Sequence, residues 1–400
     1  MIKVVYPYDK DSSVLKESFN DSYYQKVISQ INGDVDKLNN SLLKRITYNG
    51  TKLNLKKIIT ADFVELVEIF SLINKNKNRR KRICKYFEKI INGKKTSVYK
   101  NAQGAISNFL MDENLNLKTC YYCNIDNINV FEERYIYNSA EDLINNAPKE
   151  VLVIFDKISD ETAQEIISNR HLNSVYDYLD KILSPIVFKR LKKEIIDKWV
   201  TLNVNEIIIK KNQFTLDHFL PKKEFPYFSL SLYNLVPSCS SCNCKFKGSL
   251  EFLPDAKLKF LSPSSREFKL CDDLEFNLFF NVMSSDLTQT LENVTSFDHF
   301  EVKIVDKNDN TGFETFLNMF KLRGRYEFHK NVALEMIAKR KIYSDSQVNE
   351  FSELLIRKGI NKDVASIKKD IFGSSIFNDD EKNESFAKYK KSIAEQLGIM

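Results

Sequence analysis

The residues with the clearest chemical potential lie between positions 215 and 249. In chain order this stretch holds an Asp-His pair, an Asn, and a Cys-x-x-Cys motif that runs into a second Asn: Asp217, His218, Asn234, Cys239, Cys242 and Asn243. Hydrolysis of a phosphodiester needs a base for the attacking water and a cation beside the phosphate. His218 suits the first task because an imidazole titrates near neutral pH. Asp217 and Asn243 suit the second because their oxygens are good magnesium ligands.

The Asp-His pair also constrains the local backbone. Neighbouring side chains of an extended strand point to opposite faces, so Asp217 and His218 can serve one site only if the strand ends there. Pro221 predicts such an ending, because proline cannot donate a hydrogen bond to a sheet ladder.

A second Cys-x-x-Cys lies far upstream, at Cys120 and Cys123. One such motif alone is compatible with redox chemistry or with coincidence. Two pairs supply four thiolates, the number that a tetrahedral structural zinc requires, so we predict a zinc site at Cys120, Cys123, Cys239 and Cys242. Cys244 is expected to be a buried apolar side chain, although it lies close enough to compete as a ligand.

The combined pattern, D-H-x-x-P followed by N-L-x-P-x-C-x-x-C-N with lysines behind it, resembles the HNH nucleases of the ββα-metal class in their zinc-bound form. The resemblance implies an α+β protein, predominantly helical, with an embedded ββα-metal module and a zinc knuckle. It also implies that His218 is the general base and that Asn234 braces the loop between hairpin and helix. Asp217 and Asn243 would then hold the catalytic Mg²⁺ or Mn²⁺.

The chain departs from that family pattern in two places. Many relatives read C-N-x-x-K-G, whereas here one more residue separates Asn243 from Lys247 and Gly248. Lys245 and Lys247 are therefore both candidates for contacting phosphate. Residues 124–214 also separate the first cysteine pair from the Asp-His pair, and we expect the knuckle and the hairpin to meet at the base of this insertion.

The rest of the chain must position these groups. With 400 residues it exceeds what one core usually fills, and its 43% apolar and 28% charged content is that of an ordinary globular protein. We predict a helical region over 1–115, the nuclease module over 116–260 with its insertion at 124–214, and a mixed, then helical region over 261–400. No apolar run reaches membrane length and residues 1–20 lack the core of a signal peptide, so a cytoplasmic location is expected.

Apolar periodicity gives the expected elements. Helices are predicted at 15–31, 53–73 and 82–91, and strands at 206–210, 275–281 and 300–305. One long helix is predicted from Phe320 to about Lys341. A second Asp-His pair, Asp298-His299, has no proline, asparagine or cysteine pair behind it and is interpreted as a coincidence.

Two basic segments are candidates for nucleic-acid contact. Residues 75–85 hold seven basic side chains, which could form a phosphate-binding patch or simply a solvated helix entrance. Residues 322–330 match the L-x-x-R-Y-x-x-H-K helix that follows the nuclease core in a subset of bacterial HNH proteins. The resemblance makes Arg323 and Arg325 candidates for lining a DNA groove; the alternative is a helix face in water.

The function implied is that of a metal-dependent endonuclease on DNA. Low sequence specificity is expected, because no recognition helix or finger array is evident. The resemblance further implies an effector of bacterial antiphage defence, like the Septu-type nuclease subunits, with a regulatory partner such as an ATPase. The second interpretation is a zinc-knuckle DNA-binding or scaffold protein with a vestigial nuclease core, which would need only the four cysteines.

Overall fold

The computed structural model describes residues 2–6, 13–31, 35–91, 102–113, 115, 117–138, 140–155, 158–170, 206–248, 250, 252, 257–281, 286–308, 311–377 and 384–400. Within these ranges the chain is α+β, as predicted: helices surround two-stranded antiparallel sheets. None of the described helices is long and apolar enough to cross a membrane.

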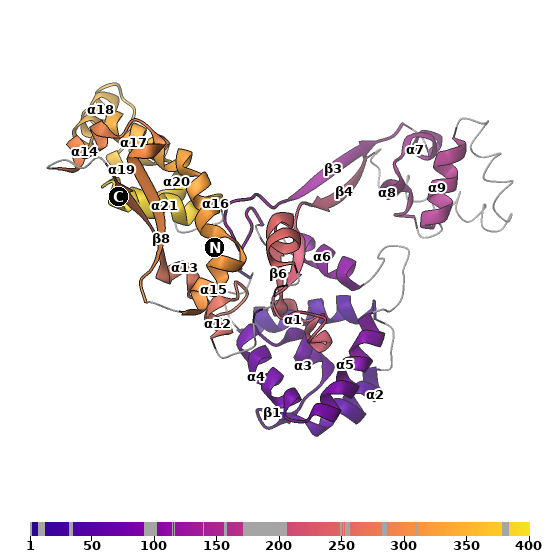
Figure 1. The fold of residues 1–400 in the computed structure, drawn as a ribbon. Coiled ribbons are helices and arrows are strands. Elements are labelled where there is room, and N and C mark those ends of the chain that lie inside the picture. The colour runs from indigo at the N-terminus through magenta and orange to yellow at the C-terminus, as the bar shows by residue number, and fades with distance from the viewer. Residues whose placement is uncertain are drawn as a thin grey trace.

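The N-terminal part is helical, as periodicity predicted, and forms the lower lobe of Figure 1. The predicted helix 53–73 is divided at Asp62, because the Asp62 carboxylate accepts from the backbone N of Glu65 while the Glu65 side chain bonds back to Asp62. The elements are α1 (Ser13–Ile28), α2 (Val35–Lys37), η1 (Leu38–Leu42), η2 (Leu43–Arg45), β1 (Thr47–Tyr48), β2 (Thr51–Lys52), α3 (Leu55–Thr60), α4 (Phe63–Asn74), α5 (Lys77–Ile91) and α6 (Ala102–Asp112).

The insertion extends from the body as an arm (Figure 1). Its stem is an antiparallel ribbon of β3 (Val130–Ile136) and β4 (Glu206–Asn212), and α7 (Ala140–Asn146), α8 (Lys149–Leu152) and α9 (Asp160–Asn169) pack at its far end around their own apolar cluster. Gln213 N donates to Asn129 O at the base of the ribbon. The insertion therefore returns to the point where it left, as expected.

The central element is a hairpin followed by a helix. Strand β5 (Thr215–His218) pairs antiparallel with β6 (Leu235–Ser238), and η5 (Ser241–Lys247) follows directly. The connection contains two short 3₁₀ turns, η3 (Pro226–Phe228) and η4 (Leu232–Asn234). The order is thus strand, strand, helix, with β5 ending at His218 as the sequence predicted.

The C-terminal part packs helices on the sheet of β7 (Leu274–Phe280) and β8 (Phe300–Asp306), and both predicted strands are confirmed. The predicted single helix from Phe320 to Lys341 is wrong. His329 has a non-helical backbone and its ring packs on Phe386, which separates α16 (Leu322–Phe328) from α17 (Lys330–Ile342). The remaining elements are α12 (Leu258–Leu261), α13 (Leu270–Asp273), α14 (Leu287–Asn293), η6 (Phe297–His299), α15 (Thr311–Met319), α18 (Asp345–Arg357), α19 (Val364–Phe372), α20 (Ser374–Phe377) and α21 (Ala387–Gln396).

Candidate active site and metal centre

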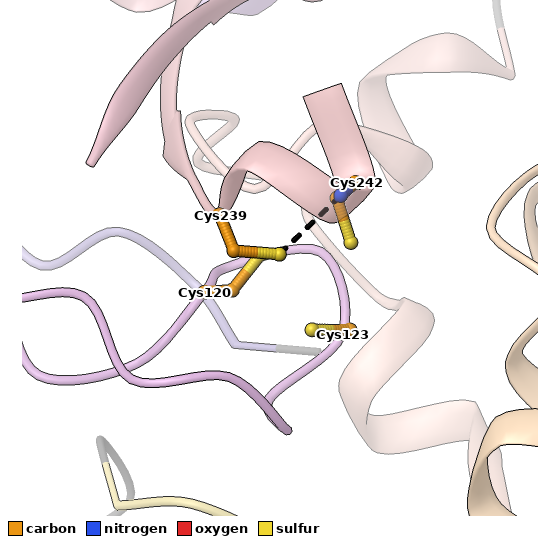
Figure 2. Close-up of side chains that lie close together, drawn as sticks. All are labelled: Cys120, Cys123, Cys239 and Cys242. Atoms are coloured by element: carbon orange, nitrogen blue, oxygen red, sulfur yellow. Dashed lines mark hydrogen bonds between the residues drawn. The ribbon is translucent and has the colours of Figure 1, made fainter. Parts of the chain in front are cut away.

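The two cysteine pairs meet in one cluster. Cys120 and Cys123 come from the turn before the arm, Cys239 directly follows β6, and Cys242 lies in the first turn of η5. All four are buried, and their sulfur atoms lie within 4.8 Å of one another (Figure 2). Cys244 is exposed and outside this cluster, so its expected burial is wrong. The four sulfurs have the number and spacing to bind a metal such as zinc.

Backbone and charge around the sulfurs favour a metal. The backbone N of Cys242 donates to the Cys239 sulfur (3.3 Å), and that of Ile125 to the Cys123 sulfur (3.4 Å). Burial alone would raise the pKa of Cys123, but hydrogen bonds from the other three thiols lower it well below its usual value. The pKa values of Cys239 and Cys242 are raised, because their hydrogen bonds favour their own protonated forms. A divalent cation bound by the four sulfur atoms would stabilise the thiolate form of all four.

Arg325 belongs to the surroundings of this cluster. Its guanidinium donates to the Cys242 sulfur (3.2 Å) and to Asp126 Oδ2 (2.9 Å). The side chain is only 15% exposed. The predicted DNA-groove residue is therefore held against the cysteines, where its charge offsets thiolate charge.

Asp217 lies at the centre of a buried charged cluster. Its carboxylate accepts from Lys247 Nζ (2.8 Å) at one oxygen and from the Tyr122 hydroxyl at the other. Lys247 also donates to the backbone carbonyl of His218 (2.8 Å). Burial and then the Asp217 charge raise the pKa of Tyr122 well above its usual value, so the phenol stays protonated and donates. Sequence reasoning missed Tyr122, although it lies between the first two cysteines.

Lys247 was predicted to contact phosphate, and the structure gives it an internal partner instead. Its side chain is 4% exposed and the Asp217 side chain 7%. A buried ammonium is tolerated because the carboxylate and a carbonyl satisfy it. The Asp217 carboxylate is in turn neutralised by this lysine.

His218 is oriented by a backbone carbonyl. Its Nε2 lies 2.9 Å from Ser229 O, and a carbonyl oxygen can only accept. Nε2 therefore carries the proton in the neutral ring, and Nδ1 holds the free lone pair. Burial lowers the pKa of His218 to about 4, so the ring is neutral at pH 7. A neutral, oriented imidazole with one basic nitrogen can act as a general base.

Asn234 fixes the loop that follows His218. Its Oδ1 accepts from Leu220 N (2.7 Å), and its Nδ2 donates to the carbonyls of Leu220 and Phe228 (both 3.0 Å). The side chain is fully buried. Its amide hydrogen-bonds both the backbone N and the backbone O of Leu220, as the backbone of a neighbouring strand would. Asn234 thus holds the backbone of Leu220 and Phe228 together across the loop.

Asn243 lies on η5, which has π-helical hydrogen bonding: Gly248 N donates to Asn243 O, five residues back. The residue is half-buried. η5 contacts the hairpin through Lys247, and its first turn supplies Cys242. One short helix therefore joins the cysteine cluster to the carboxylate of Asp217.

The remaining residues that were predicted to contact nucleic acid differ in whether a carboxylate of the protein already pairs with them. Arg323 is exposed, but both ends of its guanidinium bond Glu314 (2.9 and 2.8 Å). Lys245 is exposed and has no carboxylate partner within the described ranges. The coincidental histidine, His299, accepts from Thr295 N through Nδ1 (3.1 Å) at the turn before β8.

Searches against protein-family models, curated proteins and solved structures found no match for this chain.

Replacing a cluster cysteine should remove the metal. Cys120→Ser is expected to abolish zinc retention and to lower the melting temperature, because three thiolates and a hydroxyl hold zinc far less well. Arg325→Gln should weaken zinc affinity about 10- to 100-fold, as expected for a group that contacts a ligand. Zinc content and competition with a chelator would measure both effects.

Cys244→Ser is the control, since this exposed cysteine lies on the same helix as Cys242 but outside the cluster. It should retain zinc and stability. Normal folding of Cys120→Ser without zinc would contradict a structural metal.

Removing the buried ammonium group of Lys247 should lower the stability of the fold. Lys247→Met is expected to destabilise the protein by about 3–5 kcal/mol, because Asp217 would be left as an uncompensated buried charge. The double variant Asp217→Asn, Lys247→Met should recover part of that loss. Denaturant unfolding would measure the differences, and Lys245→Met, an exposed lysine on the same helix, should change stability by less than about 0.5 kcal/mol. If Lys247→Met and Lys245→Met changed the unfolding free energy equally, the result would contradict a stabilising buried pair of Lys247 and Asp217.

The lowered pKa of His218 predicts a pH effect on stability without added divalent ion. The unfolded ring titrates near 6.5 and the folded ring near 4, so its stabilising contribution is complete above 6.5 and falls as the pH drops toward 4. The difference in melting temperature between the unaltered protein and His218→Gln should therefore narrow as the pH falls through this window. A constant difference would show that the ring titrates normally.

Proposed function

We propose that this chain is an HNH-type endonuclease that hydrolyses DNA with low sequence specificity. The observation that carries the proposal is the setting of His218: it ends the first strand of a hairpin-helix unit, and its Nε2 is held by the Ser229 carbonyl. In the proposed reaction Nδ1 takes a proton from water, the hydroxide attacks phosphorus, and the leaving oxygen departs as the phosphodiester bond breaks. Asn234 keeps the loop beside His218 in place.

The catalytic cation is part of the proposal. Asp217 and Asn243 are the expected ligands of Mg²⁺ or Mn²⁺, which when bound would offset charge on the phosphate. Each Asp217 oxygen already accepts one hydrogen bond and keeps a second lone pair. Lys247 supplies one positive charge at this carboxylate whether or not a metal is present.

The second candidate is a zinc-dependent DNA-binding or scaffold protein. The specific observation in its favour is that Asp217 is buried and neutralised by Lys247. This candidate needs the cysteine cluster but gives no reason for the orientation of His218. We therefore favour the nuclease.

The cellular role follows only from the sequence resemblance. We propose an effector of bacterial antiphage defence that works in the cytoplasm with a regulatory partner, such as an ATPase. The described part of the arm has an apolar cluster of its own, and this separately packed part is the surface proposed for such a partner.

The decisive test is His218→Ala on plasmid DNA with magnesium or manganese. Loss of the base should lower the cleavage rate about 10²- to 10⁴-fold while zinc content stays unchanged, because His218 lies outside the cysteine cluster. His299→Ala, in the other Asp-His pair, should cut like the unaltered protein.

Two results would reverse the assignment. Full activity of His218→Ala with loss in His299→Ala would place the active site elsewhere. No cleavage of DNA or RNA by any version with any metal would favour the binding protein.

A further inference from the structure

A cavity of about 410 Å³ lies beside the cysteine cluster, between η5 and α16. Its walls combine cations with aromatic rings: Lys245, Phe246, Lys321, Arg325, Phe328 and His329. Lys247 of the same helix η5 contacts Asp217, whereas Lys245 lines this cavity. The lining of the cavity therefore shares no residue with the contacts of Asp217 and His218 described above.

One aromatic ring of the cavity wall is exposed to solvent. Phe328, the last residue of α16, is 83% exposed. Its ring packs edge-on against His329 (5.2 Å between centroids), which in turn packs on Phe386 (4.9 Å). At 83% exposure, most of the surface of the Phe328 ring is open to solvent. An open aromatic face next to cations is the arrangement on which single-stranded nucleic acids stack their bases.

Only part of the positive charge that lines the cavity is paired with a carboxylate of the protein. The one carboxylate of the lining, Asp126, is paired with Arg325 (2.9 Å). Lys245 and Lys321 are both exposed and have no ion-pair partner in the described part of the chain. Two ammonium groups thus remain for an anionic ligand such as a phosphodiester.

The backbone at Lys321 adds an independent observation. This residue has φ 54° and ψ 34°, the left-handed conformation that glycine adopts freely and that lysine adopts at a cost. The turn between α15 and α16 therefore keeps a long cationic side chain at the cavity wall where glycine would be easier to accommodate. Strain of this kind is concentrated at functional sites.

We propose that this cavity binds an unpaired nucleotide of the substrate strand, with its base stacked on Phe328 and its phosphate held by Lys245 and Lys321. The proposal rests on the proposed function, because it takes the ligand to be part of a nucleic-acid substrate. It adds the substrate class: a strand with unpaired bases, such as single-stranded DNA, a flap or an opened duplex. A strand that crosses η5 would reach both this cavity and His218.

The test uses the full chain with His218→Ala, so that cleavage does not consume the probe. The probe is a fluorescein-labelled single strand of about 10 nucleotides of mixed sequence. The matched probe is the same strand annealed to its complement. Fluorescence anisotropy gives the dissociation constants.

Phe328→Ala should weaken binding of the single strand about 5- to 100-fold, the range for loss of one stacked base, and change binding of the duplex far less. Phe328→Trp should restore it. Phe351→Ala, which removes another exposed phenylalanine (49%) from the distant helix α18, should leave both affinities unchanged.

Lys321→Gly separates ligand contact from structure. Glycine adopts the same backbone freely, so the melting temperature should stay the same or rise. The slope of log affinity against log salt should nevertheless fall by about one, because one phosphate contact is lost.

Unchanged single-strand affinity in Phe328→Ala, equal losses for single strand and duplex, or no single-strand binding by the parent protein would each overturn the inference. Binding does not require cleavage, so the outcome is separate from that of the nuclease proposal. A protein that binds single strands through Phe328 but cuts nothing would refute only the nuclease. One that cuts through His218 without dependence on Phe328 would refute only the cavity.

Discussion

The arrangement of the candidate site depends on the meeting of four sulfur atoms from two distant segments. Tyr122 lies between Cys120 and Cys123, and Lys247 lies on the helix that begins beside Cys242, so the cluster that joins these segments also brings both side chains to Asp217. A metal that holds the sulfurs would fix the hydroxyl and the ammonium around the carboxylate. The charge distribution beside His218 in this way follows from the meeting of the two cysteine pairs.

The end of β5 and the helices α1, α3, α4 and α5 were predictable because a proline three residues after His218 and apolar periodicity act over short distances. The cysteine cluster was predictable because two Cys-x-x-Cys pairs supply the four ligands of one structural zinc. The partners of Asp217 were not predictable, because Tyr122 lies 95 residues away in the chain and lysine is normally a surface residue. Strand β3 was also missed: its centre is a run of three charged residues, Glu132, Glu133 and Arg134, and none of its residues is buried.

The extra residue between Asn243 and Gly248 has a structural explanation in η5. A π-turn contains more residues than an α-turn, so it can take up one added residue without changing the direction of the chain beyond the helix. Lys247 therefore still points to Asp217, and Gly248, with φ 48°, ends the helix in a conformation that favours glycine. The spacing of the family pattern alone left both Lys245 and Lys247 as candidates for contacting phosphate. The helix geometry assigns Lys247 to the interior and Lys245 to the surface.

The low pKa of His218 has several causes in the residues around the ring. Burial is the main reason that its pKa is low, and the charges of Lys222 and Lys247 lower it further, against the opposing effects of the Ser229 carbonyl and Asp217. Lys222 is exposed at the start of the loop that Asn234 braces. Lys247 is buried and paired with Asp217, so of these two lysines only the exposed Lys222 would also attract a phosphodiester under the proposed function. Under the proposed function, Lys222 would thus favour both a neutral base and the approach of an anionic substrate.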